Sequence, residues 1–358
     1  MTLLDKYIIK KFLGTFFYAI ALIISITIIF DLSEKIDDFL QKQAPISAIV
    51  FDYYLNFIPY FINLFSPLFT FIAVVFFTSK MAYDTEIVAI LASGISFRRM
   101  LLPYMFSAGM LAGISFLLIN FIIPRANQKR LAFENLYIRN QFRNNENNIH
   151  RQIGPGTFIY FESYNNIENV GYQFSMDKIE DGKLSYKLMS DFARWDAGTQ
   201  KWAIENYQIR TVNGLKETLV KGWRLDTVLN IKPEDFSRRI NTVETMNYFE
   251  LNKFIEEEKF KGSSNIAFYE ISKYQRISLP FATFILTLIG VAIASRKVRG
   301  GIGIHIGIGL LISFSYILFM QVSNTFATNA GVAPIIAVWI PNIIYFFLSV
   351  YLLRIAPK

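Results

Sequence analysis

The chain contains no cysteine and only two histidines, His150 and His305, among its 358 residues. Without cysteine there is no disulfide framework, no thiol nucleophile and no thiolate metal site. Two histidines also supply few ligands for metal clusters and few bases for histidine-dependent triads. The motifs H-E-x-x-H, G-x-S-x-G and G-x-x-x-x-G-K-[ST] do not occur. The sequence therefore predicts a chain that is not an enzyme and binds no cofactor or metal, so that any ATP hydrolysis occurs in a partner subunit.

Charged residues are also scarce, at 18%, whereas 53% of the residues are hydrophobic and the mean hydropathy is +0.33. This composition is typical of a membrane protein. The net charge of +8 is one that nucleic-acid-binding proteins share, but much of the excess lies beside the apolar stretches, where membrane topology accounts for it. We therefore expect no nucleic-acid partner.

Six apolar stretches are long enough to cross a bilayer, because a helix needs roughly 20 residues to span the hydrocarbon core. They cover residues 12–30, 53–79, 100–124 and 277–295, and two parts of the run 300–353, which a polar break at 324–331 divides. The predicted fold is an α-helical membrane protein with six transmembrane helices, three before and three after an inserted domain. The predicted domains are 1–124, 125–276 and 277–358.

The lysines and arginines of the short loops and tails indicate the orientation. Eleven of them fall on one side, in the N-terminal tail, the loop 80–99, the loop 296–299 and the C-terminal tail. The opposite short loops hold only Lys35 and Lys42. Both termini are therefore expected in the cytoplasm and the insert outside. The apolar run 12–30 is longer than a signal-peptide core and is predicted to stay as the first span.

Within the insert, residues 125–151 have a helix-like composition and predict a stalk. Five runs rich in aromatic and β-branched residues then predict strands, at 157–163, 170–177, 184–190, 202–212 and 218–228. The dipeptides Asp181-Gly182 and Asn213-Gly214 predict two tight hairpins, because their residues tolerate positive φ. Helical composition returns at 245–261. The insert is thus predicted to be all-β and β-jellyroll-like, with sandwich and open barrel as alternatives. Its aromatic side chains either fill a core or line an apolar groove for a lipid tail.

The cytoplasmic loop between the second and third spans predicts a short helix at about 84–94. Asp84 or Thr85 is expected to cap its first turn, where Glu86 meets the helix dipole, and Gly94 to end it. Two interpretations remain open: an interfacial helix lying on the membrane, or a coupling helix inserted into a groove of an ATPase, with Glu86 as its polar contact. The candidate coupling residues are Asp84, Glu86, Ile87, Ile90, Leu91 and Gly94.

The string at residues 86–96 (EIVAILASGIS) resembles the cytoplasmic loop of the LptF/LptG permease family, the membrane subunits of the ABC transporter that extracts lipopolysaccharide. The opening residues 4–8 (LDKYI), the three-plus-three layout and the strand-rich insert are similar to the same family, and the opening is more LptG-like than LptF-like. The resemblance implies a transport subunit of the bacterial inner membrane with a periplasmic jellyroll. It also implies four partners: a second LptF/LptG-type permease in a heterodimer, a cytoplasmic ATPase homodimer that holds ATP and magnesium, a periplasmic bridge protein, and lipopolysaccharide.

In such a family, spans one and five form lateral gates through which lipopolysaccharide enters a cavity between the two permeases. On span five, Gly303 and Gly307 form a G-x-x-x-G pair that allows close helix approach. That pair either packs permanently within this chain or slides against the partner permease. Further candidates on this span are Ser315 and Phe319 as gate positions, and Gln321 and Asn324 as contacts with a lipid head group or, alternatively, as hydrogen-bond partners of a neighbouring helix. His305 is expected to snorkel to the membrane interface.

Lipid phosphates need basic partners, and the outer end of span one offers Lys35 and Lys42. Four acidic residues share that segment, so a phosphate clamp competes there with an ordinary solvated helix end or with acids that bridge through divalent cations. Two other functions remain as alternatives: a permease of another ABC exporter class, and a membrane-anchored sensor or scaffold that binds lipid without transport. The other exporters commonly place a large domain after the first of four spans, which this layout does not match.

Overall fold

The computed structural model describes residues 2–139, 144, 146–296 and 302–356. The chain divides into two compact units. The helical unit comprises residues 1–138, 243–251 and 267–358, and the sheet unit comprises residues 139–242 and 252–266. The sheet unit therefore lies within the predicted insert of 125–276.

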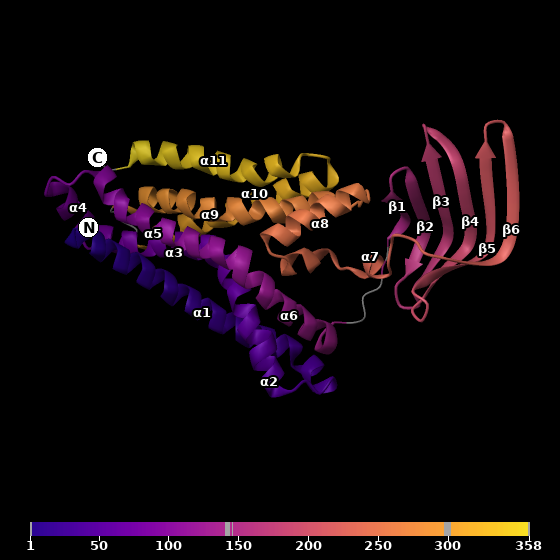
Figure 1. Cartoon of the computed structure of the whole chain (residues 1–358). Coiled ribbons are helices and arrows are strands. Elements are labelled where there is room, and N and C mark those ends of the chain that lie inside the picture. The colour runs from indigo at the N-terminus through magenta and orange to yellow at the C-terminus, as the bar shows by residue number, and fades with distance from the viewer. Residues whose placement is uncertain (1, 140–143, 145, 297–301, 357–358) are drawn as a thin grey trace. The chain divides into compact units, whose positions relative to one another are not determined.

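Six helices of the described residues are long and apolar enough to cross a membrane, three on each side of the insert, as predicted (Figure 1). The first three are α1 (Leu3–Gln41), the continuous run of α2 (Ile46–Ala48), η1 (Ile49–Tyr54) and α3 (Leu55–Tyr83), and the run of α5 (Phe97–Leu117), η2 (Leu118–Ile122) and α6 (Ile123–Tyr137). The short helix α4 (Glu86–Ala92) lies between the second and third. The last three are α9 (Ile266–Ala294), α10 (Ile302–Asn329) and α11 (Pro334–Ile355).

Helix α1 begins with a capping box in which the Thr2 side chain accepts from the Asp5 N–H and the Asp5 carboxylate accepts from the Thr2 N–H. This pairing satisfies two backbone donors that the first turn leaves open. A stripe of buried residues with a spacing of four then packs α1 onto its own chain: Ile8, Phe12, Phe16, Ile20 and Ile24. The other positions of α1, apart from Asp5 and Phe39, are exposed or only partly buried.

The predicted break in the last apolar run is shorter than expected, because α10 stays helical through Asn324 as far as Asn329. At this end the threonine hydroxyls bond back to the preceding turn: Thr325 donates to the Gln321 carbonyl at 2.9 Å and Thr328 to the Thr325 carbonyl at 3.1 Å. The chain reverses at residues 330–333, where Gly331 has φ +72°.

The sheet unit holds one six-stranded antiparallel sheet whose strands lie side by side in sequence order (Figure 1). The strands are β1 (Asn147–Gly154), β2 (Thr157–Asn165), β3 (Val170–Glu180), β4 (Lys183–Asp196), β5 (Lys201–Asn213) and β6 (Lys216–Thr227). This confirms an all-β insert and specifies a meander for the described strands. Three short helical segments follow: α7 (Glu234–Ser237), η3 (Ile240–Thr245) and α8 (Tyr248–Phe260).

Both predicted hairpins are confirmed. Asp181 and Gly182 have φ of 49° and 73° between paired Glu180 and Lys183, so the β3–β4 loop uses positive φ at both central positions. In the β5–β6 loop, Gly214 alone takes positive φ, at 65°.

Strand β1 was missed, because residues 125–151 were predicted to be a helical stalk. The helical part ends with α6 at Tyr137, and β1 runs from Asn147 to Gly154. The only fully buried residues of β1 are Ile149 and Ile153. The prediction rested on the helix-like composition of residues 125–151, which does not mark the change from helix to strand within that range.

One face of the sheet carries the core of this unit. Its largest fully buried side chains are those of Trp202, Tyr164, Phe161 and Phe174, and Phe236 of α7 packs edge-on against Phe161. The Trp202 indole donates to the Ile231 carbonyl at 2.9 Å. These aromatic side chains fill a core, which was one of the two interpretations of the aromatic-rich insert.

Candidate coupling loop and gate helices

Helix α4 lies within the loop helix predicted at 84–94. The predicted side-chain cap is wrong: Thr85 precedes the helix at φ 63°, and its hydroxyl donates to the Asp84 carbonyl at 2.7 Å instead of accepting from the first turn. The left-handed backbone at Thr85 makes the sharp entry from α3. At the other end Gly94 has φ +86°, which is the conformation expected of it.

The two sides of α4 differ sharply in burial. Ile87 is only 1% exposed and belongs to the apolar cluster of Ile8 and Phe12, against which Ile90 and Leu91 also pack. Ile87, Ile90 and Leu91, which were candidates for insertion into an ATPase groove, therefore pack on their own chain. The exposed face consists of small or short side chains at positions Val88, Ala89, Ala92 and Ser93, and Asp84 is exposed beside it.

Glu86 also faces the protein's own first helix. Its carboxylate accepts from the Tyr7 hydroxyl at 2.8 Å and from the Lys11 ammonium at 3.1 Å. The Lys11 ammonium in turn lies 4.3 Å from the centre of the Tyr7 ring. The side chains of Glu86 and Lys11 remain 31% exposed, so this cluster is accessible from the solvent.

A second ion pair joins the same two regions. Arg99, near the start of α5, donates through both terminal nitrogens to the two oxygens of Asp5, at 2.7 and 2.8 Å. Asp5 is the acid of the capping box at the start of α1. Sequence reasoning missed both partners, because the pair joins residues 94 positions apart and no local pattern indicates it.

Helices α1 and α10 are the least covered of the six. In each, 22% of the apolar window is buried, against 33–67% in the other four. Gly303 and Gly307 are exposed on α10, and a Cβ at either position would meet no described atom within 4 Å. Permanent packing of this G-x-x-x-G pair within the chain, one of the two interpretations above, is therefore not observed among the described residues.

The remaining candidates on α10 differ in whether they form hydrogen bonds within the chain. The Ser315 hydroxyl lies 2.5 Å from the Tyr345 hydroxyl of α11. Phe319 and Gln321 are exposed, and the Asn324 Oδ1 is buried without a hydrogen bond from a described residue. His305 does not snorkel as expected: it is buried, and its Nε2 lies 2.9 Å from the Arg296 carbonyl. That contact gives the ring a partner inside the protein.

At the far end of α1 the basic candidates have neighbours in the chain. The Lys35 ammonium is paired with the Asp31 carboxylate and the Tyr53 hydroxyl. The Tyr54 hydroxyl donates to the other Asp31 oxygen at 3.2 Å. Lys42 is exposed as the C-terminal cap of the helix, its N–H bonded to the Asp38 carbonyl at 3.1 Å. The acidic segment around Lys35 is thus partly neutralised within the chain.

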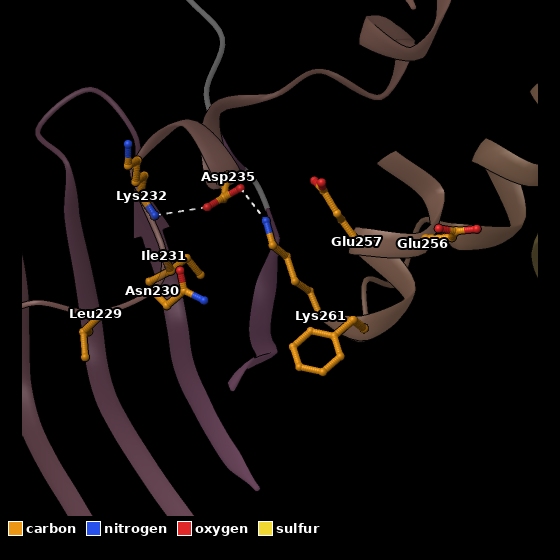
Figure 2. Close-up of a pocket in the computed structure, with 9 residues that line it drawn as sticks. Leu229, Asn230, Ile231, Lys232, Asp235, Glu256, Glu257 and Lys261 are labelled. Atoms are coloured by element: carbon orange, nitrogen blue, oxygen red, sulfur yellow. Dashed lines mark hydrogen bonds and ion pairs between the residues drawn. The ribbon is translucent and has the colours of Figure 1, made fainter. Parts of the chain in front are cut away.

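A cavity of about 570 Å³ lies in the sheet unit, and its lining is charged (Figure 2). Lys261 and Asp235 form an ion pair at 2.8 Å at its edge, and the Lys232 N–H donates to the other Asp235 oxygen at 3.1 Å. Glu256, Glu257 and Asn230 complete the polar lining, and the apolar side chains are Leu229, Ile231 and Phe260.

Together these features define a class: a multi-pass membrane protein in which six apolar helices flank an inserted antiparallel sheet, with no histidine or cysteine cluster at its candidate sites. The family model described as "Lipopolysaccharide export system permease LptF/LptG" matches residues 6–355. The chain belongs to this family of lipopolysaccharide export permeases. Permeases of this kind are transmembrane subunits of an ABC transporter and are not catalytic. A search of curated proteins finds no match.

Proposed function

We propose that this permease takes lipopolysaccharide sideways from the outer leaflet of the bacterial inner membrane into a cavity shared with a second LptF/LptG-type permease. A cytoplasmic ATPase homodimer, which binds ATP and magnesium, drives the cavity to close. The lipid then moves to a periplasmic bridge protein. In this arrangement both termini are cytoplasmic and the sheet unit is periplasmic.

The observation that carries this proposal is that the first and fifth spans, α1 and α10, are the two least covered helices. A lateral gate has to present an apolar surface that its own chain leaves open. The exposed Gly303 and Gly307 favour a helix of the partner permease opposite α10. Small residues allow two helix backbones to pack closely, whereas lipid tails form no such close contact. Phe319 and Gln321 share that helix and are proposed to face the cavity.

The ATPase contact is proposed on the exposed face of α4. Ala89, Ala92 and Ser93 let another backbone approach closely, and Val88 adds apolar area. The opposite face of α4 packs on the chain itself: Glu86 bonds to α1, and the apolar cluster of α1 contacts Ile87, Ile90 and Leu91. Asp84 and Gly94 define its ends. This distribution gives the loop both a docking face and an anchored face.

Two finer proposals rest on the sequence. The opening at residues 4–8 supports an LptG-like rather than an LptF-like member. The predominance of lysine and arginine at the termini and at the loops 80–99 and 296–299 supports cytoplasmic termini. Labelling of single introduced cysteines in intact cells tests the orientation, since the chain has none of its own.

The central test is co-purification in mild detergent, followed by Ala89→Arg. The unaltered chain is expected to bring along an ATPase and a second six-span permease, and to release lipopolysaccharide from proteoliposomes with ATP. Ala89→Arg is expected to reduce the amount of co-purified ATPase at least tenfold, because the long arginine side chain blocks close approach of the ATPase to α4. Ala197→Arg, the same change in an exposed turn of the sheet unit, is the matched control. Retention of the ATPase by Ala89→Arg contradicts the docking face.

A further inference from the structure

The loop that carries α4 is tied to α1 at both of its ends. Glu86, the first residue of α4, binds Tyr7 and Lys11, and Arg99, just beyond the loop, binds Asp5. On α1 the two attachment points, Asp5 and Lys11, are about 9 Å apart along the helix axis. Two separated contacts restrain both the position and the rotation of α1 relative to the loop, which one contact alone does not.

Between these two polar contacts, α1 and the loop also pack through apolar side chains. Ile8, which falls between Asp5 and Lys11, is fully buried in the same cluster as Ile87 of α4 and Phe97 of α5. The first turns of α1 are thus fixed to the loop by one buried isoleucine and, on either side of it along the helix, by a polar contact. Because packed interiors resist compression, a displacement of α4 is passed to this end of α1 rather than absorbed.

Further along, fewer side chains of α1 are buried. Its buried stripe ends at Ile24, and none of residues 25–38, all of which the structure describes, is fully buried until Phe39. Beyond that stretch α1 is held again, because Phe39 packs with Tyr53 and the Tyr54 hydroxyl donates to Asp31. In the two ion pairs the Asp5 carboxylate is buried, whereas Glu86 and Lys11 are partly exposed. Their geometry is the specific feature: the two-pronged pair of Arg99 with Asp5 fixes direction as well as distance.

We propose that the Asp5–Arg99 and Glu86–Tyr7–Lys11 contacts are a two-point linkage that makes α1 move with the ATPase-coupling loop. Asp5, Arg99, Tyr7 and Lys11 are then positioning residues for transport, although they touch neither lipid nor nucleotide. This proposal rests on the proposed function, because it assigns the first step by which the docked loop reaches a gate helix.

The test uses the Asp5–Arg99 pair, because Glu86 lies on the docking helix itself and its replacement affects both events. The variants are Asp5→Arg, Arg99→Asp and the double exchange. Thr2→Ala removes the helix cap but leaves the ion pair, and is therefore the matched control for Asp5→Arg. Spin labels at Ser25→Cys on α1 and Ile114→Cys on α5, both exposed, report the movement of α1 in the assembled complex with cysteine-free partners.

In the unaltered complex the distance between the two spin labels is expected to differ between the nucleotide-free and the ATP–vanadate states. In each single reversal the ATPase is expected to co-purify while the shift is lost and lipopolysaccharide release from proteoliposomes falls about tenfold. The double exchange is expected to restore the shift and at least half of the release, and Thr2→Ala to retain both.

Two results overturn the linkage: single reversals that shift and transport like the unaltered complex, or a double exchange that stays as defective as the single reversals. A failure of the proposed function looks different, because then the unaltered chain neither brings along an ATPase nor shows a nucleotide-dependent shift.

Discussion

The Tyr316 hydroxyl of α10 donates to the Asn342 Oδ1 of α11 at 2.9 Å, in the middle of two apolar helices. Asn342 in turn donates through its amide to the Ser278 carbonyl of α9 at 3.0 Å. One asparagine therefore joins all three helices of the second triplet. Between helices in lipid such bonds supply part of the association that the hydrophobic effect supplies in water.

Replacing Asn342 with leucine is expected to weaken this triplet by about 1–2 kcal/mol, because the Tyr316 hydroxyl and a backbone carbonyl lose their partner. Thermal unfolding in detergent measures the loss as a lower midpoint. Ile343→Leu, at the neighbouring exposed position, is the control and is expected to unfold like the unaltered protein. Equal midpoints for both variants contradict a stabilising role of Asn342.

In the sheet unit, Trp202→Phe is expected to lower protection of the β5 amides against hydrogen exchange by about 1–3 kcal/mol, because the bond to the Ile231 carbonyl and part of the buried ring are lost. Trp223→Phe makes the same chemical change at a side chain that is 78% exposed. Hydrogen exchange of the full-length protein is expected to show the loss for Trp202→Phe alone. A similar loss in both variants indicates that burial of Trp202 is not the cause.

Gly307→Leu is expected to leave the stability of the isolated chain unchanged, since a side chain there meets open space, but to reduce co-purification of the second permease severalfold. Gly113→Leu on α5, at another glycine with open space around it, is expected to leave the pairing intact. The ratio of the two permeases after purification measures the effect. Loss of pairing in both variants points to a general perturbation instead of a specific α10 contact.

Lys35→Glu together with Lys42→Glu is expected to reduce photo-crosslinking of lipopolysaccharide to this end of α1, as the phosphate-contact hypothesis requires. The structure adds a variant in the opposite direction. Asp31→Asn removes the charge paired with Lys35 and is expected to raise the crosslinking yield. If neither change alters the yield, the two lysines have no role in lipid binding.

The six spans and the two hairpins could be predicted from the sequence because their causes are local. A run of about 20 apolar residues is enough to specify a helix in a bilayer, and Asp181-Gly182 supplies positive φ wherever it occurs. Strand β1 was missed because the helix-like composition of residues 125–151 predicted one stalk, whereas the chain changes to a strand at Asn147. Pairing with β2 decided the outcome, and pairing is a tertiary event.

The site was determined differently. The sequence by itself predicted a short apolar helix at about 84–94 with an acid in its first turn, since spacing, charge and the terminating glycine are all local properties, and the structure has this helix at Glu86–Ala92. Only the tertiary structure decided that Ile87 faces inward and that Glu86 meets Lys11, 75 positions earlier. A helix that is apolar nearly all round has no preferred side of its own, so the choice falls to whatever surface the folded chain brings against it, which here is the first turns of α1.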